Sequence, residues 1–245
     1  MGRRLASTQV SSPGSLPGGG RTVSGFDRLA ALVAKDLLVE LRSREVAYST
    51  LVFALLVLLI FNFAFELRVE NLQALAPGVL WVTFIFAAVL ALSRLFAAER
   101  DRGALEGLLL CPVDRGTIYL AKLISALVLM LAVEAVAVPV FIALFGLNLP
   151  LGPLGLVAFL GSLGFASVGT LFSALAAHTR TREGLLPLLL FPISVPVIIA
   201  TVKATGGVVA GEPWGVTLPW LQLLAGFDVL FAGLSYLVFE LAVEE

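Results

Sequence analysis

Charged residues, cysteine and histidine are all scarce in this sequence, and each shortage excludes a class of protein. Asp, Glu, Lys and Arg make up 13% of the 245 residues, whereas soluble domains carry roughly 25%. Hydrophobic residues make up 59%, which is more than a soluble core of ordinary size can bury. The net charge of −1 gives no indication of a nucleic-acid partner. The composition therefore predicts an integral membrane protein.

The single cysteine, Cys111, and the single histidine, His178, limit the chemistry that the chain can carry. One cysteine excludes an internal disulfide, and one histidine excludes a Cys/His metal cluster. His178 stands beside Arg180 and Arg182, where we expect a solvated polar residue rather than a ligand of haem iron. The G-x-x-x-x-G-K-[ST], H-E-x-x-H and G-x-S-x-G motifs are also absent. We therefore expect no catalytic site and no metal site, and any ATP must be bound by another chain.

Long apolar runs are what the sequence has in abundance. A membrane span needs about 20 apolar residues, and open sheets do not exist in lipid, so each run is expected to form a helix. The predicted spans cover residues 47–65, 77–97, 117–145, 153–177, 185–205 and 216–239. The predicted fold class is all-α: a polytopic membrane protein with six transmembrane helices.

The Lys and Arg residues predict the orientation of the chain. All but two of the 16 lie before the first span or around the loops after the second and fourth spans, and the exceptions are Arg68 and Lys203. Because positively charged loops stay in the cytoplasm, both termini are expected there. Trp214 and Trp220 then fall near the outer interface, where aromatic side chains gather.

The segment before the first span divides into two parts. Residues 1–25 are rich in Ser, Gly and Pro and predict a disordered cytoplasmic tail, followed by the six-span domain over 26–245. Residues 26–46 predict an amphipathic helix along the inner leaflet, with packing on another cytoplasmic protein as the alternative. Its expected apolar face comprises Phe26, Leu29, Ala30, Val33, Leu37 and Leu41, and its expected basic face comprises Arg28, Lys35 and Arg42.

Two spans carry patterns that bear on helix packing. Small residues recur every fourth position in the fourth span, at Ala158, Ser162, Ala166, Thr170 and Ala174. Such spacing lets helices approach closely, and we favour packing within one bundle over a dimer or conduit interface. The fifth span holds Pro187, Pro192 and Pro196, which predict a bent or broken helix.

Ionisable residues inside the predicted spans are few. Glu134 lies midway along the third span and Asp228 lies in the sixth, with Asn62 of the first span as a weaker polar candidate. A charged carboxylate at the bilayer centre costs roughly 2.5–3.5 kcal/mol, so these groups should be protonated, paired or beside a wet cavity. A role in a substrate path and a buried hydrogen bond between helices are both open, and the second is favoured.

A charged segment, residues 99–115, separates the second and third spans. In a helix, Glu99, Arg102 and Glu106 share a polar face opposite an apolar one, and Pro112 ends the helix. A short cytoplasmic helix of this kind suits a contact with a soluble motor, although a simple interfacial loop fits the spacing equally well. The pattern E-x-x-x-G-x-L-E-x-L-L-x-x-P resembles the coupling loop of type-2 ABC exporter permeases. It is carried by Glu99, Gly103, Leu105, Glu106, Leu108, Leu109 and Pro112.

A wider stretch, residues 75–122, resembles the haem exporter protein B (CcmB) family of cytochrome c maturation. The matching residues outside the loop are Ala76, Pro77, Gly78, Trp81, Arg94, Leu95 and Phe96. The resemblance implies a permease subunit in the bacterial inner membrane, present in two copies or paired. It implies a separate ATPase, CcmA, the membrane proteins CcmC and CcmD, the haem chaperone CcmE, and haem as the possible cargo.

Two alternatives remain open at this point. One is a type-2 ABC permease for another cargo, such as a drug, lipid or polysaccharide. The other is a membrane scaffold that transports nothing. A membrane enzyme has little support, because no catalytic constellation is present.

Overall fold

A computed structural model of the chain describes residues 25–65, 72–95, 114–147, 149–177 and 182–242. That part of the chain folds into seven helices, and six of them are long and apolar enough to cross a membrane. The helices are α1 Gly25–Ser43, α2 Glu45–Phe65, α3 Leu72–Leu95, α6 Arg115–Phe145, α7 Leu151–Ala177, α8 Arg182–Val209 and α9 Trp214–Ala242. The predicted all-α polytopic fold and all six predicted spans are confirmed, with ends shifted by a few residues.

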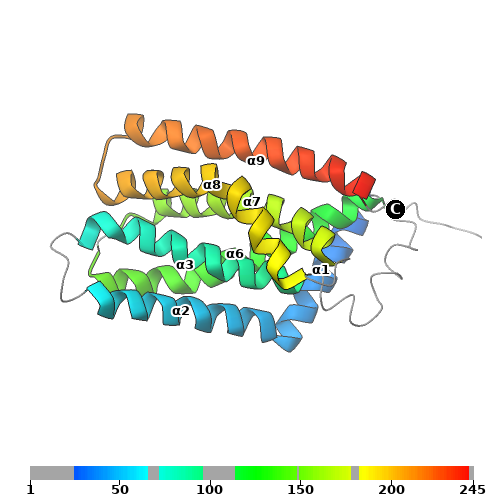
Figure 1. Cartoon of the computed structure of the whole chain (residues 1–245), viewed down its shortest axis with the longest axis horizontal. Coiled ribbons are helices and arrows are strands. Elements are labelled where there is room, and N and C mark those ends of the chain that lie inside the picture. The colour runs from blue at the N-terminus through cyan, green and yellow to red at the C-terminus, as the bar shows by residue number, and fades with distance from the viewer. Residues whose placement is uncertain (1–24, 66–71, 96–113, 148, 178–181, 243–245) are drawn as a thin grey trace, which may run out of the picture.

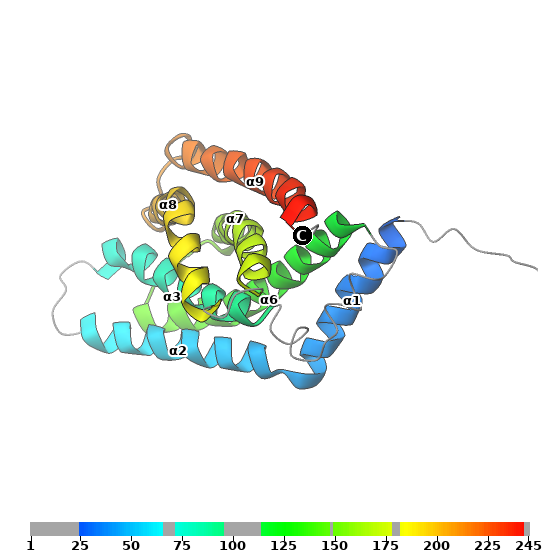
Figure 2. The ribbon, with the colours of Figure 1, turned by 45° about the vertical axis from the view of Figure 1, so that its right-hand side comes forward.

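The six spans form one bundle with α7 at its centre. α7 packs against α3, α6, α8 and α9 and is buried over most of its length, whereas α2 and α9 are buried over little of theirs (Figures 1 and 2). The buried positions include all five members of the small-residue stripe, Ala158, Ser162, Ala166, Thr170 and Ala174. The stripe therefore serves packing within one bundle, which is the preferred prediction, because small side chains let neighbouring backbones approach.

Prolines shape one of the outer spans. α8 contains Pro187, Pro192 and Pro196, and each removes a backbone donor from the helix. Figure 1 shows the yellow first part of α8 running at an angle to its orange remainder, so the helix is bent as predicted. The chain nevertheless stays helical from Arg182 to Val209. The prolines thus redirect α8 without breaking it.

A left-handed residue separates α1 from α2. Arg44 has a φ of 54°, an uncommon conformation for any residue other than glycine, and its N–H donates to the Glu40 carbonyl at 2.6 Å. The Glu40 carboxylate in turn accepts a hydrogen bond from the Ala47 N–H at 2.7 Å, which caps the start of α2. The predicted amphipathic helix over 26–46 is therefore too long: it ends at Ser43, and residues 45 and 46 already belong to the first span.

α1 lies across one end of the bundle and packs mainly against α6 (Figure 2). None of its residues is fully buried, and Phe26 and Leu41 of the predicted apolar face are 77% and 67% exposed. Leu29, Val33 and Leu37 of the same face are half-buried. The bundle therefore covers only part of the apolar face of α1, which leaves the rest available to lipid or to another protein.

Candidate functional site

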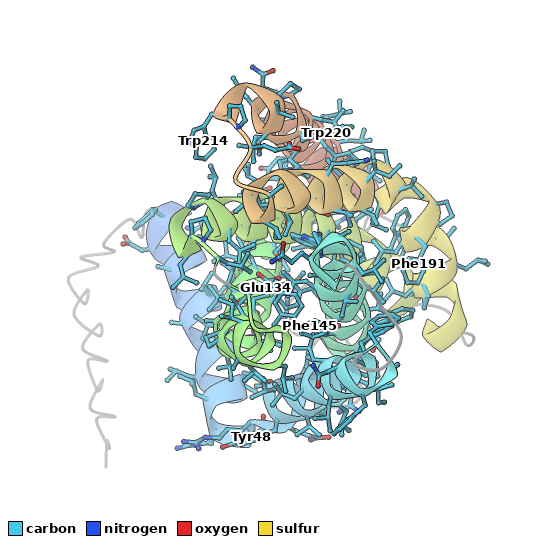
Figure 3. All side chains as sticks on the ribbon, turned by 90° about the vertical axis from the view of Figure 1, so that its left-hand side faces the viewer. Tyr48, Glu134, Phe145, Phe191, Trp214 and Trp220 are labelled. Carbon is cyan, nitrogen blue, oxygen red and sulfur yellow. The ribbon has the colours of Figure 1, made fainter. Side chains whose placement is uncertain are left out.

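Glu134, from the middle of α6, lies in the interior of the bundle (Figure 3). The residue is 5% exposed, and its Oε1 accepts a hydrogen bond from the hydroxyl of Ser162 on α7. Its second oxygen, Oε2, has no hydrogen-bond partner among the described residues. Glu134 therefore ties α6 to the central helix and keeps one acceptor atom free.

Asp228 approaches the central helix from α9. It is 4% exposed, and neither carboxyl oxygen has a hydrogen-bond partner in the described part of the chain. A Cβ added at Gly164 would lie 2.6 Å from Oδ1 of Asp228, so the carboxyl group packs directly against the backbone of α7. Any side chain at position 164 would have to displace this carboxyl group.

The two buried carboxyl groups lie on different sides of α7. Their contact residues, Ser162 and Gly164, are two positions apart, which is about 200° around a helix. Both residues are thus buried within spans, but the structure does not bring them together into one site, and a role for them in a substrate path stays a prediction.

Two small cavities border Glu134. One is about 10 Å³ and is lined in part by Trp81, Ser162 and Thr201, and the other, of the same volume, is lined in part by Thr50. This volume is at the lower limit for one water molecule, and a water needs polar partners. The free oxygen of Glu134 and the Thr50 hydroxyl, which also has no partner in the described residues, provide such partners. Glu134 thus meets the expectation of a paired group beside a small polar cavity.

Trp81, one of the residues that carry the family resemblance, lines one of the two small cavities beside Glu134. Its indole Nε1 donates a hydrogen bond to the Thr205 hydroxyl on α8 at 2.8 Å. A Cβ on Gly161 of α7 would lie 2.3 Å from the Trp81 ring. Trp81 therefore fixes α3 against both α7 and α8.

A second polar cluster lies at the end of the bundle near α1. Lys122 of α6 is only 4% exposed and its Nζ lies 3.0 Å from a carboxyl oxygen of Asp36 on α1, which also pairs with Lys35 at 3.0 Å. Arg94 of α3 and Glu45 of α2 make a more exposed ion pair at 3.5 Å. Charges of opposite sign thus connect α1 with α6 and α2 with α3.

The sequence reasoning missed the pair between Lys122 and Asp36. The orientation argument groups Lys122 with the loop charges, but it lies inside the apolar run 117–145 and so needs a partner as much as Glu134 does. Asp36 carried no signal of its own, because it lies between the expected basic and apolar faces, about 100° around the helix from Lys35. The position of Lys122 inside an apolar run is the signal from which a buried partner could have been predicted.

Other predicted residues have different outcomes. Asn62 is satisfied by donating to the Leu144 carbonyl at 2.8 Å, which links α2 to α6. The predicted coupling residues Glu99, Gly103, Leu105, Glu106, Leu108, Leu109 and Pro112 lie outside the described residues, as do Cys111 and His178. Within the described ranges, no group of three or more His, Cys, Asp or Glu could hold a metal ion.

The arrangement is that of a helical membrane protein with six spans, in which a few buried polar groups link helices across a largely apolar core. A family model described as CcmB protein matches residues 27–245, and the chain belongs to this family.

Three curated relatives are similar over most of the chain. "Heme exporter protein B" of Bradyrhizobium diazoefficiens is 33% identical over 201 residues, 80% of this chain and 89% of the relative. The proteins of the same name from Pseudomonas aeruginosa and Paracoccus denitrificans are 28% and 31% identical. These two alignments cover 79% and 75% of this chain and 87% and 84% of the relatives. The predicted resemblance to the haem exporter protein B family is thereby confirmed.

Proposed function

We propose that this chain is the permease subunit of an ABC complex for haem export in cytochrome c maturation. The observation that carries the proposal is the family match over residues 27–245, together with relatives whose printed name is heme exporter protein B. The proposal places the chain in the bacterial inner membrane with both termini in the cytoplasm. ATP binds to a separate subunit, CcmA.

The segment 99–112 is proposed as the contact with that ATPase. It joins α3 to α6, so any force applied to it reaches both helices through the covalent chain. Leu105, Leu108 and Leu109 would dock into the ATPase, and Glu99 and Glu106 would fix the register of the contact. Closure of the ATPase on ATP would then displace this segment.

α6 is suited to carry the displacement into the bundle. Its first turns are linked to α1 by the pair between Lys122 and Asp36, and its middle is linked to α7 by the hydrogen bond between Glu134 and Ser162. Because α7 packs against four other spans, a shift of α6 would be felt across the bundle. This route supports transmission of force rather than chemistry inside the permease.

The remaining partners follow from the family. Two copies of the chain would match two ATPase subunits, and CcmC, CcmD and the haem chaperone CcmE complete the proposed complex. In this proposal ATP hydrolysis drives release of the haem-loaded chaperone, and haem is the cargo of the complex rather than a ligand held by axial residues of this chain.

Charge reversal at the coupling segment tests the proposed contact. Glu106→Lys is expected to reduce co-purification of the ATPase and membrane-bound ATP hydrolysis at least about tenfold, because a like charge opposes the docked register. The matched control is Glu212→Lys, since Glu212 is exposed in the turn between α8 and α9, at the opposite end of the bundle (Figure 1). Equal ATPase recovery with both variants would show that the segment is not the docking site.

Deletion of the gene tests the cargo. The proposal expects loss of haem-stained c-type cytochromes, with haem-loaded chaperone accumulating in the membrane. Normal c-type cytochromes together with impaired export of a drug, lipid or polysaccharide would favour the other permease class. ATP hydrolysis in the assembled complex that does not depend on this chain would favour a scaffold.

A further inference from the structure

A large groove lies between the amphipathic helix and the spans beside it. Its volume is about 580 Å³, far larger than the cavities at Glu134, and α1, α2, α3 and α6 all contribute to its walls. The polar cluster around Lys122 and Asp36 borders it. The proposed transmission of force through α6 gives no role to a groove of this size. The lining of the groove therefore needs a separate explanation.

The groove has a basic end and an apolar end. Lys122 of α6 lies at the end near α1, and Val128, Leu129, Ala132 and Val133 line the wall further along the same helix. From Lys122 to Val133 the helix rises by about 16 Å at 1.5 Å per residue. One leaflet of the hydrocarbon core is about 15 Å thick, half of about 30 Å. The groove is therefore about as long as one leaflet is deep, which is the reach of a lipid acyl chain.

The charges at the basic end favour an anion. Four basic residues line the groove against two acidic ones, Asp36 and Glu40. Glu40 is engaged by the Ala47 N–H and Asp36 by two lysines, so neither carboxylate faces the groove without a partner.

Arg44 is the basic side chain best placed to meet that anion. Its guanidinium donates to the Leu41 carbonyl at 3.2 Å and to the Tyr48 hydroxyl at 3.3 Å, and the described residues provide no carboxylate within ion-pair distance of it. The left-handed backbone at Arg44 turns the chain from α1 into α2, at the rim of the groove. Its remaining N–H donors are suited to phosphate oxygens.

We propose that this groove binds one anionic phospholipid of the leaflet that faces α1, with its phosphate at Arg44 and one acyl chain along Val128, Leu129 and Ala132 of α6. Arg94 stands beside the same rim, and its exposed 3.5 Å pair with Glu45 is weak enough to share the guanidinium with a phosphate. The bound lipid would lie between α1 and α6 and fix the distance between these helices. This assignment does not depend on the cargo of the complex.

A lipid fits this groove better than haem does. None of the lining residues that the structure describes is His, Cys or Met, and the one tyrosine, Tyr48, already accepts a hydrogen bond from Arg44. Haem iron would find no strong axial ligand there. An apolar wall about as long as one leaflet is deep, with basic residues at one end, matches an anionic headgroup and an acyl chain.

Native mass spectrometry of the full-length chain in detergent tests the proposal. After delipidation, the chain is titrated with phosphatidylglycerol, phosphatidylcholine or haemin. The expected result is one retained phosphatidylglycerol, with phosphatidylcholine bound at least about fivefold more weakly, since each basic residue near a membrane surface contributes roughly 1 kcal/mol toward anionic lipid. Equal retention of the two lipids by the unaltered chain would overturn the proposal without any variant.

Matched variants locate the lipid. Arg44→Gln is expected to weaken phosphatidylglycerol binding roughly five- to tenfold, and Ala132→Phe is expected to abolish it by filling the apolar end. The controls are Lys203→Gln, an exposed cation outside the groove lining, and Ala143→Phe, an exposed alanine about 16 Å further along α6. Both controls should bind as the unaltered chain does.

Three results would contradict the assignment. The first is retention of lipid by Ala132→Phe at the original level. The second is competitive displacement of the lipid by haemin, together with loss of haemin binding in Arg44→Gln and Ala132→Phe. The third is dissociation of a dimer by Ala132→Phe with no change in lipid count, which would make the groove an interface between copies.

Discussion

At the scale of single residues, Gly161 shows how tightly the central helix is packed. A Cβ there would lie 2.3 Å from the Trp81 ring and 2.5 Å from the Thr201 methyl group. Gly161→Ala is therefore expected to lower the free energy of unfolding by about 1–3 kcal/mol through overpacking. The control is Gly155→Ala on the same helix, where nothing lies within 4 Å of the new Cβ. Gly155→Ala should be neutral or stabilising by up to about 1 kcal/mol, measured by unfolding of the purified chain in detergent.

The hydrogen bond between Ser162 and Glu134 belongs to the same scale. Ser162→Ala leaves a second oxygen of a buried carboxyl group without a partner, which should cost roughly 1–2 kcal/mol. Ser194→Ala is the matched control, because the Ser194 hydroxyl is also fully buried and has no hydrogen-bond partner among the described residues. A loss of stability as large in Ser194→Ala as in Ser162→Ala would contradict the account.

Variants of Glu134 can distinguish a role of this residue in helix packing from a role in transport. Glu134→Gln keeps an oxygen that can accept a hydrogen bond from the Ser162 hydroxyl, so c-type cytochrome assembly is expected to persist. Glu134→Leu removes this acceptor and should reduce both the stability of the chain and c-type cytochrome assembly. The measurement is haem staining of c-type cytochromes beside the amount of folded chain in the membrane. Loss of assembly in Glu134→Gln at a normal amount of folded chain would show that the carboxyl group takes part in transport.

At the scale of elements, the docking of α1 on α6 depends on a pair of charges 86 positions apart in the sequence, Asp36 and Lys122. Asp36→Asn removes the carboxylate from a buried ammonium group, so the amides of α1 should exchange hydrogen at least about tenfold faster. Lys35→Met is the control, because Lys35 is 44% exposed and contributes little by its pair with the same carboxylate. Unchanged exchange in Asp36→Asn would mean that apolar contacts alone hold α1.

Sequence patterns were sufficient for the spans and insufficient for their contacts. Length and hydropathy determine which segments cross a membrane, so all six helices were predicted, and proline chemistry predicted the bend in α8. The break at Arg44 was missed because a left-handed arginine has no local signature, unlike glycine. Glu134 was predicted from its position within a span, but its partner Ser162 was not, since helix rotation is set by tertiary packing.

At the scale of the whole molecule, two exposed apolar faces lie outside a largely apolar core that contains a few polar groups. α2 and α9 present large apolar side chains outward, among them Ile60 and Phe63 on α2 and Val229 and Leu230 on α9, each at least 62% exposed. Lipid or a second copy must cover these faces, in keeping with a subunit of a membrane complex. The ion pairs of the described residues that connect α1 with α6 and α2 with α3 lie at the end where α1 lies, and Trp214 and Trp220 (labelled in Figure 3) belong to the first turns of α9, which begins at the other end (Figure 1).

The sidedness of residues 99–112 is the central claim at this scale, because an ATPase can push on this segment only from the cytoplasm. The native Cys111 is the chain's single cysteine and lies within the segment. Labelling with a membrane-impermeant maleimide should modify Cys111 in inverted vesicles and not in intact spheroplasts. Lys203→Cys in a Cys111→Ser background should show the reverse pattern. Modification of Cys111 in spheroplasts would place the segment on the outer face and contradict the account.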